Sequence, residues 1–560
     1  MSFTSIPFYL FAALTLLLHY VLPRRFQWIV LLVMSFVFYA SWGLELIPFV
    51  LVATLMAWLC ARKMEAIYAS SDARIKVAKD AGENPPMRVW KEEAKKQCRR
   101  WLWLALAVLI AALAFVKLQK QMANIPVLSW IPWFFSKAYH HFGKLLLKLP
   151  GSQLFLIDTV FSDHAAMAST VSILVPLGIS YYTFSLISYV ADVYWRKDKA
   201  EQRYFRLLAF TLYFPKILQG PISRHKDLAP QLFEGHAFDY TKFCFGLQRM
   251  VWGYFKKMVI ADRLAVFVNT VFGNIVGETG AHLLVASLFG ALQLYCDFSG
   301  CMDIACGFSE CLGLTLAENF NHPFFSKTAA EFWRRWHITL GTWFKDYVFM
   351  PMLISPRLLS LSKKVRNIAG ERAGKAVMKI VPLLAVWLLT AAWHGVGVNY
   401  LAWGAYWFVI LMTASVFENE LHSLTKLLRI DTGTDDWHLF QMLRTFCIYM
   451  IGHLFTRLDS VSAVWRTLKT ILTDFHLEGF FDGSLYSLGL DRANFLLALA
   501  MIVVLWAVAM LEKKGSLRKQ IAKFGLVTRW LIYYAAIFSI IVFGIYGPGY
   551  NASSFIYMRY

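Results

Sequence analysis

Two histidines in this chain each close a dense run of polar and aromatic residues. His337 ends the motif Glu331-Phe-Trp-Arg-Arg-Trp-His337, and His394 ends the apolar run that begins at Val381. An ionisable group at membrane depth is costly, which makes it a candidate for function. Imidazole is also the side chain best suited to take a proton from a hydroxyl near neutral pH. We therefore predict general-base chemistry on a hydroxyl, with a hydrogen-bonding role between helices as the structural alternative.

The elements that position these histidines are membrane helices. The chain is 58% hydrophobic and only 16% charged, with a mean hydropathy of +0.50, whereas a soluble domain is about a quarter charged. Its apolar runs, extended by flanking tryptophans and tyrosines, predict an all-α polytopic membrane protein with about 10–12 transmembrane helices. The runs are 6–22, 28–42, 46–60, 101–116, 171–190, 281–295, 380–393, 400–417, 440–455, 495–511 and 530–545.

The distribution of basic residues predicts the orientation. Eleven Lys and Arg against six Asp and Glu lie between Arg62 and Arg100, and basic clusters recur in 357–379 and 513–523. The positive-inside rule places these segments in the cytoplasm and both termini outside. We attribute the net charge of +21 to this topology and to attraction by anionic lipid. The lipid bilayer is thus an expected partner, and nucleic acid is not.

The hydropathy pattern predicts one membrane domain over residues 1–560. It includes a cytoplasmic loop at 62–100, which Pro85-Pro86 divides into two helical pieces, and an interfacial insertion at 125–163. The first apolar run lacks a basic segment before it, so we interpret it as a retained helix rather than a signal peptide. The expected catalytic core spans 215–400. No internal repeat is evident, which disfavours a transporter built from inverted halves.

The centre of the chain is too polar and too rich in proline and glycine for plain spans. Irregular polar backbone at membrane depth is tolerated only where it is buried in protein or lines a wet cavity. We therefore expect re-entrant or tilted central helices around a tunnel. The supporting or tunnel-lining candidates are Gln219, Arg224, Asp297, Ser299, Asn321, Arg334 and Asn399. The structural alternative is that Asp297, Arg224 and Arg334 pair with one another. The cysteines at 296, 301, 306 and 311 spiral around a helix, so no metal site is expected.

Several motifs together resemble the membrane-bound O-acyltransferase (MBOAT) family, and in particular its bacterial polysaccharide branch. They are Leu177-Gly-Ile-Ser-Tyr-Tyr-Thr-Phe184, Gln219-Gly-Pro-Ile222, Tyr295-Cys-Asp-Phe-Ser-Gly300, Glu318-Asn-Phe-Asn321, Phe332-Trp-Arg-Arg-Trp-His337, Trp393-His-Gly395 and the closing Gly547–Tyr557. The resemblance covers nearly the whole chain. The insertion at 125–163 has no counterpart in it, and Phe455-Thr-Arg-Leu458 departs from the expected Phe-Phe-Arg-Ala.

The resemblance implies a catalytic role for His394, with His337 as its companion, in a ring of tilted helices around a tunnel. We expect His337 to hydrogen-bond the acyl carbonyl or thioester, with Asn399 or Ser299 helping to orient it. The implied donor is a cytoplasmic acyl thioester, acetyl-CoA or an acyl carrier protein, and no cofactor is expected to be bound. An extracytoplasmic SGNH-type acyltransferase is the other implied partner, in a bacterial cell membrane.

The function that these features favour is transfer of an acyl group, acetyl first, to hydroxyls of an extracytoplasmic polysaccharide or glycopolymer. D-alanyl transfer from a carrier protein to a teichoic-acid-like polymer is the alternative. A transporter or channel whose histidines relay protons is a second alternative, which the motif set disfavours.

Overall fold

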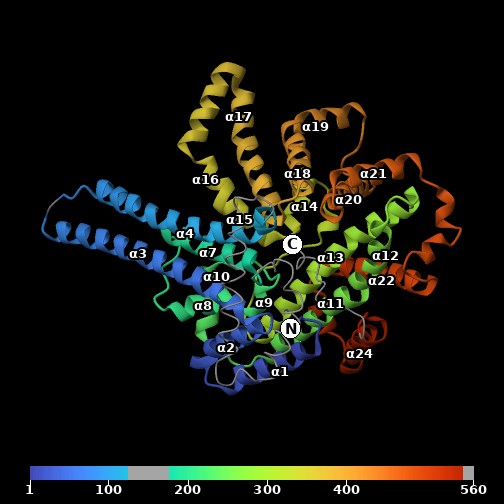
Figure 1. Ribbon diagram of the computed structural model, residues 1–560, viewed down its shortest axis with the longest axis horizontal. Helices are drawn as coiled ribbons and strands as arrows, with labels where there is room; N and C mark the ends of the chain where they lie inside the picture. Colours follow the sequence, from blue (N-terminus) through green and yellow to red (C-terminus); the bar gives the residue numbers. More distant parts are fainter. Residues whose placement is uncertain (83, 124–175, 547–560) are drawn as a thin grey trace. The chain divides into compact units, whose positions relative to one another are not determined.

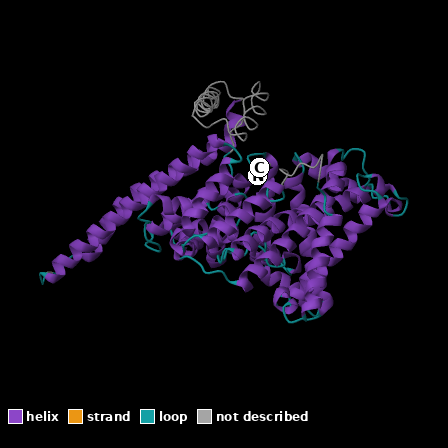
Figure 2. Cartoon of the chain, turned by 90° about the horizontal axis from the view of Figure 1, so that it is seen from below, coloured by secondary structure: helices purple, strands orange, loops and turns teal. Residues whose placement is uncertain are grey.

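The computed structural model describes residues 1–82, 84–123 and 176–546, and every regular element in these ranges is a helix (Figures 1 and 2). The one ladder contact among the described residues is an isolated bridge between Phe320 and Trp336. The all-α prediction is confirmed. The predicted insertion at 125–163 and the closing motif at 547–557 lie outside the described residues.

Each predicted apolar run falls in a helix over its described part. Six of these helices are long and apolar enough to cross a membrane, as expected for a multi-pass membrane protein. They are α3 (Ile47–Asp80), α4 (Met87–Ala123), α13 (Gly280–Cys311), α17 (Pro356–His394), α22 (Arg492–Glu512) and α24 (Leu526–Phe543).

The chain divides into two compact units. The first comprises residues 1–243 and 309–316. Besides α3 and α4, its helices are α1 (Ile6–Val21), α2 (Gln27–Ala40), α7 (Ile179–Tyr194), α8 (Tyr204–Leu212), α9 (Phe214–Ile217) and α10 (His225–Glu234), with the 3₁₀ turns Arg24–Phe26 and Leu44–Leu46.

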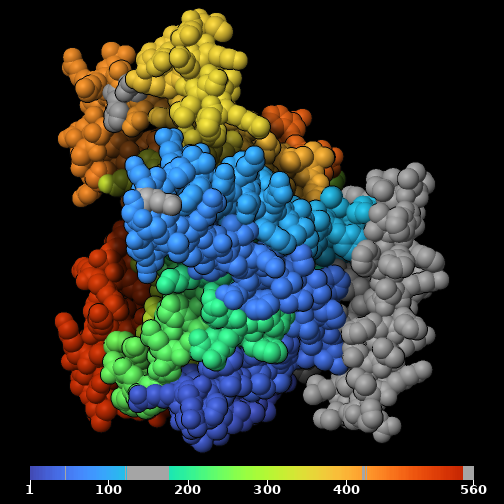
Figure 3. Space-filling model, turned by 90° about the vertical axis from the view of Figure 1, so that its left-hand side faces the viewer, coloured from blue at the N-terminus to red at the C-terminus, as the bar shows by residue number. Residues whose placement is uncertain are grey.

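Helices α3 and α4 form a long hairpin, in which the two lie side by side (Figures 1 and 3). The turn follows Asp80, where Gly82 adopts a φ of +76° and Pro85-Pro86 precedes the start of α4. Small buried residues recur on both helices, and Cys98 Sγ of α4 lies 3.6 Å from the Met64 carbonyl oxygen of α3. On α3 these are Ala53, Ala57, Cys60 and Ala61, and on α4 they are Ala94, Cys98 and Ala105. The two predicted helical pieces of the 62–100 segment are therefore present.

The second unit comprises residues 244–308 and 317–560 and contains both candidate histidines. Its helices, besides α13, α17, α22 and α24, are α11 (Tyr240–Tyr254, which begins in the first unit), α12 (Asp262–Gly273), α14 (Ala329–Arg335), α15 (Ile338–Phe344), α16 (Met350–Leu353), α18 (Val398–Val416), α19 (Glu418–Leu427), α20 (Asp435–Arg457), α21 (Val461–Thr473) and α23 (Leu517–Ile521). π-Helical turns cover Phe255–Ala261 and Lys345–Phe349, and 3₁₀ turns cover Pro323–Phe325, Leu477–Phe480 and Ser484–Ser487.

Helix α13 packs tightly against α11 and the π-helical turn that follows it. A Cβ on Gly300 would lie 2.8 Å from the carbonyl oxygen of Gly253, so a side chain at this position would separate the helices. The π-helical turn carries Lys257, whose Nζ lies 2.6 Å from Asp297 Oδ1 and 2.7 Å from Asp262 Oδ1. Asp297 therefore has a buried lysine as an ion-pair partner, which no sequence motif singled out. Its pairing with Arg224 or Arg334 stays a prediction.

Helix α17 is itself a helical hairpin that ends at the candidate site. Gly370, with a φ of +86° and a ψ of 173°, breaks it into an arm that contains the basic residues from Arg357 to Arg366 and an arm that ends at His394. The second arm crosses α18 at Gly404, where a Cβ would lie 2.8 Å from the carbonyl oxygen of Trp387. This crossing brings the start of α18 back against the end of α17.

Candidate active site

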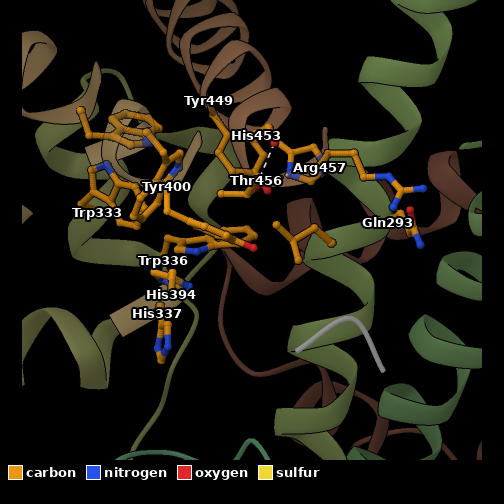
Figure 4. Close-up of a pocket in the computed structure, with 13 residues that line it drawn as sticks. Gln293, Trp333, Trp336, His337, His394, Tyr400, Tyr449, His453, Thr456 and Arg457 are labelled. Atoms are coloured by element: carbon orange, nitrogen blue, oxygen red, sulfur yellow. Dashed lines mark hydrogen bonds between the residues drawn. The ribbon is translucent and has the colours of Figure 1, made fainter. Parts of the chain in front are cut away.

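Both predicted histidines line one cavity inside the second unit (Figure 4). Its volume is about 50 Å³, and its wall combines imidazole, indole and phenol rings with a few hydrogen-bonding groups. A cavity of this size, lined mainly by aromatic rings with a few hydrogen-bonding groups, is large enough to hold water. The lining residues are Gln293, Leu294, Trp333, Trp336, His337, His394, Tyr400, Trp403, Trp407, Tyr449, His453, Thr456 and Arg457.

The backbone at His337 is held in an unusual conformation. Helix α14 begins at an N-cap, Thr328, whose hydroxyl accepts from the Glu331 amide, and it ends at Arg335. Trp336 is then extended, and His337 has a φ of 46° and a ψ of 50° before α15 begins. A non-glycine residue in this left-handed region costs on the order of 1 kcal/mol or more and persists only where its surroundings hold it. This strained connection directs the His337 ring into the cavity wall.

Asn319 supplies the contacts that hold His337. Its Oδ1 accepts hydrogen bonds from the backbone amide of Thr339 at 3.0 Å and from the Thr339 hydroxyl at 2.9 Å. Because that atom is an acceptor, the 3.2 Å contact with His337 Nδ1 is a hydrogen bond donated by the imidazole. His337 is 2% exposed, and its Nε2 has no partner among the described residues. Neutral His337 therefore offers a lone pair at Nε2, and it can donate to an acyl carbonyl only after protonation.

His394 is the last residue of α17, as the position of Gly395 predicts. A Cβ on Gly395 would lie 2.3 Å from the ring of Tyr400, so glycine is needed for that ring to cover the helix end. The His394 ring meets Trp393 and Trp403 nearly edge to face, with centroids 4.8 and 4.9 Å away. The C-terminal end of a helix favours a cation such as the imidazolium that forms when a base accepts a proton. The site therefore suits a base that becomes charged as it accepts a proton.

One indole connects the two imidazoles. The ring of Trp393 lies 6.1 Å from that of His337 and 4.8 Å from that of His394, and Figure 4 shows the two histidines side by side in the cavity wall. Further buried rings pack around them, among them Trp387 and Trp407. This aromatic shell holds the histidines in place and limits the access of water. Both imidazoles thus line one cavity, and their action at one reacting centre stays a prediction.

A third histidine, His453, lines the cavity, although it was not among the residues predicted from the sequence. His453, on α20, is 6% exposed, and its Nε2 also has no partner among the described residues. Its ring fits against Gly290, where a Cβ would lie 3.2 Å from that Nε2. Thr456 and Arg457 flank it, away from His337 and His394 (Figure 4). The signal was present in the apolar run 440–455, because the argument from an ionisable group at membrane depth applies to His453 as well.

The supporting candidates in this unit lie outside the cavity lining. Asn399 donates to the carbonyl oxygens of Phe455 and Leu458, which ties α18 to the end of α20 beside the cavity. Ser299 accepts a hydrogen bond from Lys256. The side chains of Asn321 and Arg334 are exposed. Asn319, two residues before Asn321 in the same motif, contacts His337 instead.

The other two candidates, Gln219 and Arg224, belong to the first unit. Gln219 is 1% exposed, and its amide has no partner among the described residues. Arg224 precedes α10, whose first residue, His225, pairs with Asp198 at 2.8 Å. The functional role of both candidates stays a prediction.

The comparison with protein families decides the class of enzyme. A model of the membrane-bound O-acyltransferase family matches residues 202–420, a range that contains His337 and His394. Residues 202–420 therefore carry a domain of this family. The protein is therefore an O-acyltransferase and a multi-pass membrane protein. His453 and its neighbours on α20 lie beyond the matched range.

Three relatives of this chain are named as acyltransferases that act on alginate, peptidoglycan and teichoic acid. The chain is 29% identical over 508 residues to a probable alginate O-acetylase of Azotobacter vinelandii. The match covers 90% of this chain and 84% of the relative. A peptidoglycan O-acetyltransferase of Helicobacter pylori is 28% identical over 42% of this chain and 46% of its own. A teichoic acid D-alanyltransferase of Bacillus subtilis is 29% identical over 43% of this chain and 59% of its own.

Proposed function

We propose that this enzyme transfers an acetyl group from a cytoplasmic thioester to hydroxyls of an extracytoplasmic polysaccharide in a bacterial cell membrane. The observation that carries the proposal is the pair of imidazoles, His337 and His394, in one aromatic cavity. The acetyl group is favoured by the long match to an alginate O-acetylase, since the match to the D-alanyltransferase covers less than half of the chain.

The residues divide the chemistry between them. His394 accepts the proton of the attacking hydroxyl, and its position at a helix C-terminus stabilises the resulting cation. The hydroxyl has a single hydrogen, so Nε2 of His337, whose Nδ1 is committed to Asn319, accepts a hydrogen bond from a water at the reacting centre instead. The hydroxyl oxygen bonds to the acyl carbon, the carbon–sulfur bond breaks, and the proton leaves with the thiolate.

The reaction requires that a donor from inside and an acceptor from outside reach the same cavity. Acyl transfer needs the thioester carbonyl and the acceptor hydroxyl within about 3–3.5 Å of each other. A tunnel open to both faces would allow this arrangement. On the outer side, the acceptor is the polymer itself or an SGNH-type partner that passes the acyl group on.

The donor experiment tests this function. Purified enzyme in lipid vesicles is incubated with isotope-labelled acetyl-CoA, or with a D-alanyl carrier protein, and with alginate or teichoic acid as acceptor. We expect label in alkali-labile esters of the polysaccharide from the acetyl donor only. Transfer of D-alanine with no acetyl transfer would replace the proposal by the teichoic-acid alternative. Proton or solute flux without any ester formation would favour the transporter.

The proposed direction of transfer predicts a labelling pattern in intact cells. In a Cys447→Ser background, which removes the exposed native thiol, we expect Ala81→Cys to resist a membrane-impermeant maleimide, because the basic 62–100 segment faces the cytoplasm. Tyr560→Cys should react, since the C-terminus faces outward. Permeabilised cells provide the control, in which both thiols should react. The opposite pattern would reverse the orientation and with it the direction of acyl flow.

A further inference from the structure

A second group of chemically competent side chains lies in the same unit, at the start of α13. His282 is in the first turn of that helix, Glu278 lies just before it, and Ser484 begins the 3₁₀ turn Ser484–Ser487. His282 Nδ1 lies 2.8 Å from Glu278 Oε2, and His282 Nε2 lies 2.8 Å from Ser484 Oγ. These contacts link serine, histidine and glutamate side chains, although Ser484 is far from the other two in the sequence. None of the three residues lines the histidine cavity.

The carboxylate fixes the role of the imidazole. Ionised Glu278 can only accept, so Nδ1 of neutral His282 carries the hydrogen and Nε2 carries the lone pair. The lone pair faces the Ser484 hydroxyl, which is the arrangement that lets histidine remove a serine proton. The hydroxyl has a longer second contact, 3.3 Å to the carbonyl oxygen of Gly479. The shorter contact is the one to the imidazole.

Neighbouring groups hold His282 and Ser484 in place, and one of them adds a second carboxylate near the imidazole. Thr279 accepts from the His282 amide at 3.4 Å, and Asp482 accepts from the Ser484 amide at 2.8 Å. Hydrogen bonds from Ser484 hold the pKa of Asp482 below its usual range, and the nearby His282 contributes to the same shift. A second carboxylate therefore lies close to the imidazole.

The segment that carries Ser484 is anchored on both sides. Leu485 is buried in the hydrophobic cluster that also contains Leu283 of α13. Gly280 lets the end of α21 lie against the helix start, since a Cβ there would lie 2.7 Å from the Thr470 carbonyl oxygen. Ser484 itself is only half-buried, whereas the His282 side chain is 11% exposed. The hydroxyl is thus reachable while the base beneath it is sheltered.

We propose that Ser484, His282 and Glu278 form a nucleophile site that takes an acyl group as an ester on Ser484 Oγ. Ser484 Oγ bonds to the acyl carbon of a short-chain thioester or ester, and the bond from that carbon to the leaving sulfur or oxygen breaks. The serine proton passes to His282 Nε2 and then to the leaving group. A hydroxyl of the acceptor, or water, releases the acyl group by the reverse sequence.

The position of the site gives it a place in the reaction. Helix α13 also carries Gln293 and Leu294 of the histidine cavity, three turns or about 16 Å along its axis from His282. On the proposed topology, the segment between α21 and α22 faces outward. Ser484 would then be a first outward acceptor for the acyl group, and this step rests on the proposed function.

The reactivity of the site is tested without the transferase reaction. The purified full-length protein in detergent is treated with a fluorophosphonate and with 4-nitrophenyl acetate, and modified peptides are located by mass spectrometry. We expect a phosphonyl and an acetyl adduct on Ser484, no adduct there in Ser484→Ala, and at least a tenfold slower reaction in His282→Gln and Glu278→Gln. Ser487→Ala, in the same 3₁₀ turn, is the matched control and should react like the wild type. Equal thermal unfolding of the variants excludes misfolding.

Two outcomes would overturn the nucleophile site: an unmodified Ser484 in the folded wild type, or an undiminished rate in His282→Gln. His394→Gln should leave both adducts unchanged, which separates this site from the cavity. In cells, acetyl-Ser484 should be present in the wild type and absent in His394→Gln. If it persists in that variant, the cavity does not supply the acyl group, and the relay is refuted even where Ser484 is reactive.

Discussion

His394→Gln is expected to abolish measurable acylation of the polymer while folded protein stays in the membrane. Glutamine retains hydrogen-bonding capacity and much of the size of histidine, but its amide has no basicity with which to take the hydroxyl proton. Loss of a positioned general base lowers the rate by about 10²–10⁴-fold. Ester content of the polymer and the amount of monodisperse protein after extraction are the two measurements.

His438→Gln is the matched control for this variant. His438 lies in the first turn of α20, near Asp435, and it is not among the cavity-lining residues. It should leave ester content unchanged. Normal acylation in cells that carry only His394→Gln would exclude His394 as the base, whatever the family relationship.

His337→Gln is expected to cause a loss of similar size, and the double variant His337→Gln/His394→Gln should be little worse than either single variant. The two imidazoles line one cavity, and on the proposed function they serve one reacting centre, so removing the second adds little once the first is gone. Initial rates of acetyl transfer from a labelled thioester, measured at equal amounts of folded enzyme, give the three values.

Independent sites would give a different result. If the losses in the two single variants multiply in the double variant, the histidines serve separate steps, and the shared reacting centre is refuted. A change in KM alone for His337→Gln would assign that residue to donor binding rather than to proton transfer. Asn319→Ala provides a milder perturbation, since it removes the acceptor of the His337 Nδ1 hydrogen bond but retains the imidazole itself.

The sequence determined the class of the molecule and singled out two histidines that line one cavity. Hydropathy and charge are local properties, and a helix that spans lipid must be apolar over its own length, so the helical runs could be located without knowledge of their neighbours. The end of α17 at His394 followed from Gly395 for the same reason. Local motifs also sufficed to single out His337.

Only the tertiary structure decided which groups meet. Asn319 rather than Asn399 or Ser299 holds His337, and Lys257 pairs with Asp297, because helix crossings and a π-helical turn set these contacts. His453 enters the cavity because Gly290 leaves room for its ring on a helix far away in the chain. The pairing of Ser484 with His282 likewise depends on how the segment before α22 packs on α13. Local sequence patterns predict individual helices, but they do not show how those helices pack. Contacts between residues on different helices therefore cannot be predicted from such patterns.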